Sequence, residues 1–190
     1  QFRRRASIFK ALKQETGAEW EQLSGLSGLR WVMPRVLYSE QTALQFDDEQ
    51  LRVEYHPGPH PGASWALLPA AKVAFIGDTV SIKQPPFLAL AEIDAWVDSL
   101  DVLLSADYKG YKLICGRGGV AKTADVREQR RFLKDVQRRL ERMAKRKAKS
   151  SESEKLVPKL IKKYKYPKKH EALYSQRLKH GLKQYYERAY

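Results

Sequence analysis

Short apolar runs that alternate with polar positions dominate residues 36–115 and predict strands. Pro, Gly, Asp or Ser lies between most of these runs, and these residues favour turns. One run, Val73–Ile76, is continuously apolar, which suits a strand buried on both faces. We expect strands at Val36–Tyr38, Thr42–Phe46, Leu51–Tyr55, Ser64–Leu68, Val73–Ile76 and Lys112–Cys115.

Apolar residues at steps of three and four predict helices in other parts of the chain. A short helix is expected before Gly17, and another over Ala91–Leu100. From Ala124 onward the pattern is helical, and two shorter helical segments follow within residues 156–164 and 173–185. Residues 144–155 are rich in Lys, Ser and Glu and are expected to form a solvated linker. Strands followed by helix, strand and helix indicate a layered α/β domain with a helical extension.

The charge is concentrated at one end of the chain. The net charge is +14, and residues 126–190 hold 22 Lys or Arg against 7 Asp or Glu. The remaining residues are nearly neutral, so the basicity belongs to the C-terminal region alone. Hydrophobic residues make up 43% of the chain, which is typical of a globular protein.

The single cysteine, Cys115, excludes an intrachain disulfide and a cysteine-based zinc site. It lies in an apolar run, so a buried small side chain is favoured over a nucleophile. No apolar stretch is long enough to cross a membrane, and no membrane partner is expected. A cytoplasmic location is the default for this cysteine usage.

Three loops carry the residues that could do chemistry. The first is His56-Pro-Gly-Pro-His60-Pro-Gly, in which Pro and Gly can hold a histidine rigidly at the end of a strand. In the second, Asp78 directly follows the buried run that ends at Gly77, where a carboxylate can bind a metal or act as a base. The third is the glycine-rich Gly116-Arg117-Gly-Gly119. Each loop adjoins a predicted strand, so all three are expected at one edge of a sheet.

The order and spacing of these loops resemble the second half of the metallo-β-lactamase fold. That family shows a His-Thr-Pro-Gly-His-like loop, then Phe-Thr-Gly-Asp-Thr after a strand, then a Gly-His-Gly loop. The counterparts here are the loop ending at His60, the run Phe75-Ile-Gly-Asp-Thr79, and the loop containing Arg117. The match covers roughly residues 35–145. It implies a four-layer αββα sandwich to which this chain contributes mainly the C-terminal αβ half, with the C-terminal helices added.

The resemblance also assigns roles to site residues. His60 and Asp78 would bind metal, zinc above all, with iron or manganese as alternatives. Asp78 would also be the catalytic carboxylate. Arg117 stands where the family has a histidine ligand, and a guanidinium has no lone pair for a metal. Arg117 is therefore expected to bind substrate or to pair with Asp78. One metal position at most would remain.

The family's main ligand motif, His-x-His-x-Asp-His, is absent from the 190 residues. We therefore expect a partner that supplies the N-terminal half of the fold, as part of the same gene product or as a separate chain. On this reading residues 1–147 form the C-terminal half of the domain, and residues 148–190 form a basic helical extension. A homo-oligomer is an alternative partner.

The extension has two interpretations. Lys162, Lys163, Tyr164 and Lys165 interleave cations with an aromatic ring, which is typical of nucleic-acid contacts. Alternatively, the apolar stripes pack on the domain and the cations stay solvated. For the whole chain, one hypothesis is a metal-dependent hydrolase of an ester, thioester, lactone or phosphoester, incomplete in this chain. The other is a catalytically inactive binding or scaffold module.

Overall fold

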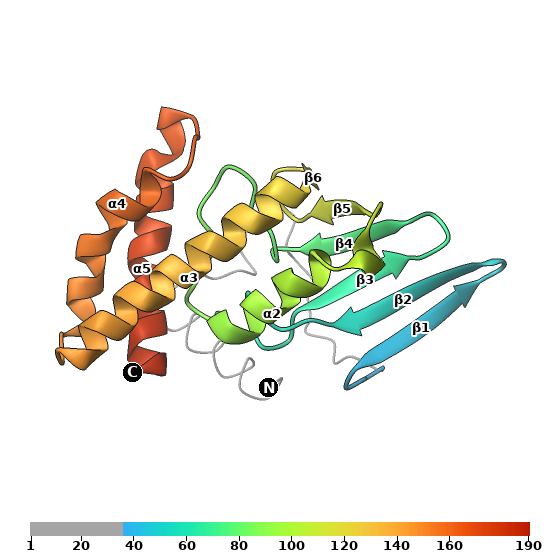
Figure 1. Cartoon of the computed structure of the whole chain (residues 1–190), viewed down its shortest axis with the longest axis horizontal. Helices are drawn as coiled ribbons and strands as arrows, with labels where there is room; N and C mark the ends of the chain where they lie inside the picture. Colours follow the sequence, from blue (N-terminus) through green and yellow to red (C-terminus); the bar gives the residue numbers. More distant parts are fainter. Residues whose placement is uncertain (1–35) are drawn as a thin grey trace, which may run out of the picture. The chain divides into compact units, whose positions relative to one another are not determined.

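The structure is a computed structural model that describes residues 36–190, of which residues 38–190 form one compact unit. Its centre is a six-stranded sheet in which neighbouring strands follow the order of the chain (Figure 1). All neighbours are antiparallel except β4 and β5, which are parallel and connected through a helix. The strands are β1 (Gln41–Phe46), β2 (Glu49–Tyr55), β3 (Ser64–Leu68), β4 (Val73–Gly77), β5 (Lys112–Cys115) and β6 (Val120–Ala121).

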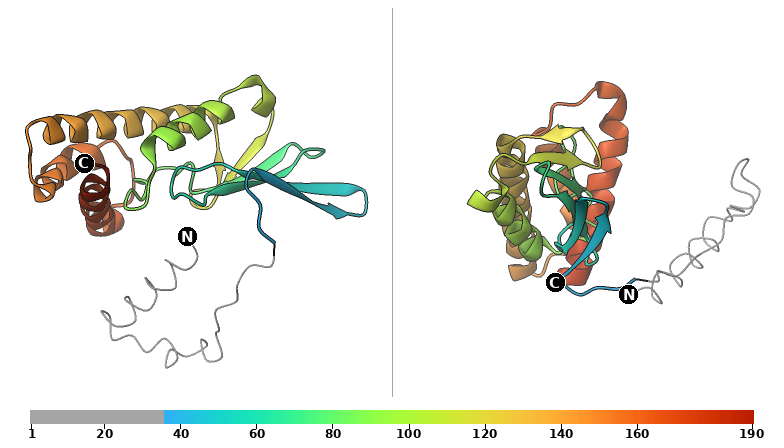
Figure 2. Two further views of the ribbon diagram at one scale, coloured as in Figure 1. Left: turned by 90° about the horizontal axis from the view of Figure 1, so that it is seen from below. Right: turned by 90° about the vertical axis from the view of Figure 1, so that its right-hand side faces the viewer.

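Four α-helices and three 3₁₀ segments lie in the described part of the chain. Helices α2 and α3 lie on the same face of the sheet, as Figure 2 shows from below. Helices α4 and α5 lie beside the far end of α3. The bounds are α2 (Ile93–Leu103), η2 (Ala106–Tyr108), α3 (Thr123–Lys145), η3 (Ser150–Leu156), α4 (Val157–Ile161), η4 (Lys168–His170) and α5 (Glu171–Ala189).

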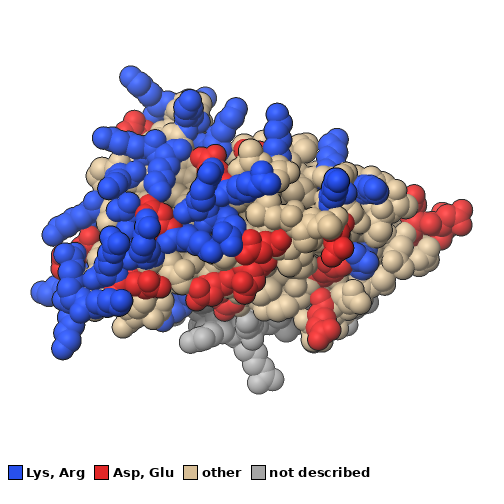
Figure 3. Space-filling model, viewed as in Figure 1, with Lys and Arg blue, Asp and Glu red and all other residues tan. Residues whose placement is uncertain are grey.

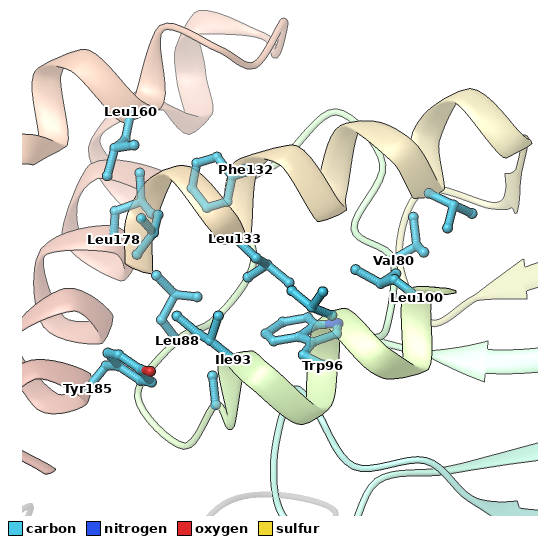
Figure 4. Close-up of a cluster of buried hydrophobic side chains, with 14 of the residues drawn as sticks. Val80, Leu88, Ile93, Trp96, Leu100, Phe132, Leu133, Leu160, Leu178 and Tyr185 are labelled. Carbon is cyan, nitrogen blue, oxygen red and sulfur yellow. The ribbon is translucent and has the colours of Figure 1, made fainter. Parts of the chain in front are cut away.

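The core lies between α2, α3 and one face of the sheet. Because successive residues of a strand point to opposite faces, Trp65 and Leu67 of β3 share this face with Ala74 and Ile76 of β4, and all four are buried. Figure 4 shows side chains from α2, α3, α4 and α5 converging with those of the loop that holds Val80 and Leu88. One continuous apolar cluster therefore joins the sheet to the C-terminal helices.

Within residues 36–190, no helix covers the other face of the sheet. The strand register places Leu44, Phe46, Tyr55, Phe75 and Val120 on this side, and all five are exposed. The prediction that Val73–Ile76 is buried on both faces is therefore wrong for this chain, since Phe75 is 43% exposed. A continuous apolar run indicates that both faces of a strand suit apolar contacts. It does not determine whether a second layer of structure covers the outer face.

The C-terminal region is more ordered than a linker and a tail. Residues 144–155 were expected to be solvated, yet Ser150–Leu156 form a 3₁₀ segment in which Ser153 is fully buried. The hydroxyl of Tyr186 donates a hydrogen bond of 2.8 Å to the carbonyl oxygen of Ala148 and ties α5 to this segment. Short polar side chains are compatible with a packed turn when backbone groups accept their hydrogen bonds.

Five of the six predicted strands are confirmed, and their observed ends lie within two residues of the predicted ends. Val36–Tyr38 is not a strand, and Val36 and Leu37 are exposed. The helix expected before Gly17 lies outside the described residues. None of the helices within residues 36–190 has the length and apolar character needed to cross a membrane.

Candidate functional site

Strand directions bring the three predicted loops to one edge of the sheet. Strand β3 begins at Ser64, immediately after the first loop, and pairs antiparallel with β4, which ends at Gly77. Strand β5 is parallel to β4 and ends at Cys115. The start of β3 and the ends of β4 and β5 must therefore meet at the same edge, as the sequence predicted.

Helix α2 holds the first loop in place. A Cβ on Gly58 would lie 2.8 Å from Cγ of Trp96, so only glycine fits against this ring. The hydroxyl of Ser99 donates to the carbonyl oxygen of Pro57 at 2.8 Å, and the amide of Glu92 donates to that of Gly58 at 2.8 Å. The Pro-Gly pattern thus reflects close packing on a helix as well as turn geometry.

His56 belongs to a structural cluster beneath the loop. Its ring stacks on Trp65 with a centroid distance of 3.5 Å, and its Nε2 lies 3.1 Å from a carboxylate oxygen of Glu54. Burial lowers the pKa of His56, although Glu54 acts in the opposite direction. The hydroxyl of Tyr108 donates to Glu54 at 2.9 Å, and burial raises the pKa of Tyr108 well above its usual value. These contacts are those of a half-buried polar cluster.

His60 lies at the turn of the same loop. Its carbonyl oxygen accepts a hydrogen bond of 3.1 Å from the amide of Ala63. Its ring Nδ1 accepts one of 3.1 Å from the amide of Gly62. In a neutral imidazole this arrangement leaves the proton on Nε2. A metal at Nε2 would therefore require the loss of the bond to Gly62.

Asp78 projects from a tightly held turn. Gly77 has φ +55°, a value that L-residues rarely adopt, and it turns the chain sharply after β4. The next residue, Thr79, is buried, and its hydroxyl and carbonyl oxygens accept hydrogen bonds of 2.8 Å from the indoles of Trp65 and Trp96. This anchoring leaves the Asp78 side chain 43% exposed at the edge of the sheet.

Arg117 and Asp78 form an ion pair across two of the loops. Nη2 of Arg117 lies 3.5 Å from Oδ2 of Asp78, and the Arg117 side chain is 46% exposed. The amide of Gly116 donates to the carbonyl oxygen of Gly77 at 2.8 Å, which fixes the two turns against each other. A Cβ on Gly118 would lie 2.7 Å from Ile82, so the glycine-rich loop also packs closely on the segment after Asp78. The pairing expected for Arg117 is present.

A second arginine reaches this region from helix α5. Nη1 of Arg177 donates to Oε1 of Gln84 at 3.1 Å, and its guanidinium lies over the ring of Tyr174. Burial lowers the pKa of Arg177, and the positive charge of Arg117 lowers it further. No pattern in the sequence indicated this residue, because 93 positions separate it from Gln84.

The described residues do not make a metal centre by themselves. Within residues 36–190 no three His, Cys, Asp or Glu side chains group closely enough to hold an ion. Asp78 already faces a permanent cation, and a catalytic zinc usually needs three protein ligands. The metal roles implied for His60 and Asp78 therefore stay predictions.

The residues predicted to contact nucleic acid are placed in different environments. Lys162 and Lys165 are exposed, whereas Nζ of Lys163 lies 2.6 Å from Asp135. Tyr164 is buried against Phe132, with ring centroids 5.2 Å apart. The prediction that Tyr164 supports nucleic-acid stacking is wrong in this conformation, because the segment after α4 turns the ring against Phe132 in the core.

Cys115 is buried, as its apolar neighbours predicted. Burial raises the pKa of its thiol to about 11, so little thiolate exists at neutral pH. This environment is that of a core side chain and not of a nucleophile.

Comparisons with solved structures identify similar folds. The chain resembles the inverting sec-alkylsulfatase Pisa1 from Pseudomonas sp., with a TM-score of 0.58 and 17% identity over 83% of this chain. It also matches the metallo-β-lactamase DIM-1, with a TM-score of 0.46 and 22% identity over 53% of this chain. A metallo-β-lactamase from Pontibacter korlensis matches with a TM-score of 0.48 and 19% identity over 66% of this chain. No protein-family profile matches the sequence, and no curated protein sequence matches it.

The chain spans only part of each of these proteins. It covers 27% of the alkylsulfatase, 47% of DIM-1 and 62% of the Pontibacter korlensis enzyme. At these identities the likeness is one of fold.

Proposed function

Because the chain has the metallo-β-lactamase fold, we propose that it forms part of a hydrolase whose reaction centre lies at the sheet edge carrying Asp78 and Arg117. The observation that carries the proposal is their ion pair, with both side chains accessible where three loops meet. The substrate would be an ester, thioester, lactone or phosphoester. A permanent cation at the edge favours a substrate that carries negative charge.

The two side chains suit complementary roles. One guanidinium nitrogen of Arg117 faces Asp78, and the other N–H groups remain to bind an anionic oxygen of the substrate. Asp78 orients the attacking water through its carboxylate. The turn anchored at Thr79 limits the movement of Asp78, as positioning of a reacting group requires.

The metal content proposed for this site is one ion at most. Arg117 holds a positive charge where a second ion would lie in the family, and it has no lone pair to donate. Zinc, iron or manganese at the remaining position would need His60 and further ligands from outside residues 36–190. We therefore assign no step of the reaction to a metal.

We propose that the partner is a second half of the same fold, seated on the open face of the sheet. Large apolar side chains at Leu44, Phe46, Tyr55, Phe75 and Val120 support this proposal, because soluble proteins rarely leave such a patch uncovered. Sedimentation of the purified full chain tests it. Self-association through this face would instead favour a homo-oligomer, and a cooperatively folding monomer would contradict both.

A second candidate is a catalytically inactive binding module. The Asp78–Arg117 pair favours it, because this pair satisfies a carboxylate that would otherwise face a metal. Such a module would keep the anion-binding capacity of Arg117 without turnover.

Metal analysis and hydrolysis by the full chain, alone and with an N-terminal half, separate the candidates. For the hydrolase we expect up to one metal per chain, and an Asp78→Asn variant should lose activity on aryl esters and phosphodiesters by about 100-fold or more. Asp107→Asn, an exposed acid on η2, is the matched control. An Arg117→His variant should raise the metal content, because imidazole restores a ligand. A metal content below about one-tenth of an ion per chain, together with equal hydrolysis rates for wild type and Asp78→Asn, would exclude the hydrolase and favour the binding module.

A further inference from the structure

The positive charge of the C-terminal region gathers on one face of the molecule. Figure 3 shows Lys and Arg crowded over α3 and α4, whereas Asp and Glu are prominent toward the strands. The sequence shows that residues 126–190 are basic, but only the fold brings α3 together with the segment after α4. Nζ of Lys163 lies 2.6 Å from Asp135 of α3 and holds the two segments together.

Helix α3 carries a straight row of exposed cations. Their spacing of three and four residues places them along one side of the helix, over a length of about 27 Å at 1.5 Å per residue. The acids Glu128 and Glu141 border the row. The row consists of Arg127, Arg131, Lys134, Arg138, Arg142 and Lys145.

Exposed lysines next to α3 extend the row into a surface. We call the α3 row together with these lysines the basic face. They lie in α4 and in the segment that follows it, beside α3 through the Lys163–Asp135 contact. The added residues are Lys159, Lys162, Lys165, Lys168 and Lys169.

The basic face has cations but lacks rings for stacking. Tyr164 is buried against Phe132, and Tyr166 packs edge-to-face on Tyr174 at 5.1 Å. Single-strand binders generally need exposed aromatic rings between their cations. Phosphate contacts need only the cations, and they carry no sequence information by themselves.

A membrane surface fits these observations less well. An interfacial helix inserts its apolar side into the lipid. The apolar side of α3, including Phe132, Leu133 and Val136, is buried in the core and therefore cannot insert into a membrane. A regular polyanion with one phosphate per roughly 3.4 Å along each strand matches a linear row of cations better.

We propose that the basic face binds double-stranded nucleic acid through its phosphate backbone, without sequence preference. The proposal is independent of the hydrolase proposal, because the basic face includes neither Asp78 nor Arg117. Duplex DNA and duplex RNA offer the same phosphate chemistry, and a direct comparison decides between them.

The test is fluorescence anisotropy of the full chain with labelled 20-base-pair duplexes of mixed sequence, as DNA and as RNA, across a salt series. We expect log K to fall with log salt with a slope of about −4, which corresponds to four or five phosphate contacts. A duplex of scrambled sequence should bind within about twofold of the first. Preference for the RNA or DNA duplex identifies the natural ligand.

Charge-neutralising variants locate the binding surface. Arg131→Gln/Arg142→Gln on the row should weaken binding by about tenfold or more and reduce the salt slope by about 2. Lys109→Gln/Lys112→Gln makes the same charge change near the start of β5 and should have an effect of twofold or less. Circular dichroism checks that both variants keep their helices.

Three results would overturn the proposal. The first is no duplex binding at about 50 mM salt and 100 μM chain. The second is an equal loss of affinity in the row variant and the control variant. The third is stronger binding to single strands, or to vesicles containing phosphatidylserine, than to duplexes, which would point to another partner.

Discussion

Replacing Asp135 with asparagine is expected to destabilise the chain by about 2–3 kcal/mol. The Asp135 side chain is 9% exposed and faces three cations, at 2.6 Å from Lys163, 3.0 Å from Arg139 and 2.6 Å from Arg138. Breaking a fully buried ion pair costs about 3–5 kcal/mol. The value is lower here because Arg138 and Lys163 are well exposed and water can solvate their charges.

The assay is thermal unfolding followed by tryptophan fluorescence, since Trp65 and Trp96 are fully buried. For a chain of this size, 2–3 kcal/mol lowers the Tm by about 5–10 °C. Asp98→Asn on α2 is the control, because it removes an acid that is exposed. If Asp135→Asn shifted the Tm no more than Asp98→Asn, the stabilising role assigned to Asp135 would be wrong.

The pH dependence of the stability difference between wild type and Asp135→Asn provides an independent check. Burial raises the pKa of Asp135, but hydrogen bonds from Lys163, Arg139 and Arg138 outweigh it and hold the pKa well below the usual range. A lowered folded-state pKa means that the stabilisation is complete above the unfolded-state value of about 3.9 and is lost as pH falls through the folded-state value. The gap between wild type and Asp135→Asn should therefore stay constant from pH 8 to 5 and narrow only below about pH 4.

Three further predictions concern Gly58 and His56, in the loop between β2 and β3, and Cys115 at the end of β5. Gly58→Ala should lower stability by about 1–3 kcal/mol, measured by thermal unfolding, because its Cβ would overlap the Trp96 ring; an unchanged Tm would contradict this packing. Partial burial lowers the pKa of His56, so its contribution to stability is complete above about pH 6.5 and is lost as pH falls through the folded-state value. His56→Gln should therefore flatten the curve of Tm against pH between pH 7 and 5. Cys115 should react with a thiol reagent about 100-fold faster in denaturant than in the folded chain, and equal rates would refute its burial.

Local patterns determined most of the sheet and the place of the candidate site. Ser64–Leu68 and Lys112–Cys115 were predicted with their observed bounds, because alternation and flanking turn residues act over a few positions. The loops at His60, Asp78 and Arg117 were predicted to share an edge, and the strand directions place them there. Strand order and turn position are enough for that inference.

Surroundings built from distant segments could not be predicted in the same way. Tyr164 lies in a run of lysines, yet it is buried because the segment after α4 lies against Phe132 of α3. Arg177 approaches the candidate site only because α5 folds back beside Gln84. Phe75 is as apolar as a core residue, but the layer that would cover it does not come from the described helices.

The sequence by itself determined the order of strands β1 to β5 and of the helices that follow them, the three loops at the sheet edge and the uneven distribution of charge. These features depend on local backbone preference, turn chemistry and composition. Only the tertiary structure decided that Arg117 pairs with Asp78, that the described helices leave one face of the sheet uncovered, and that the cations of α3 and the segment after α4 form one surface. The physical reason is that contacts between residues far apart in the sequence depend on how whole helices and strands pack. The periodicity of apolar residues predicts single elements and does not determine that packing.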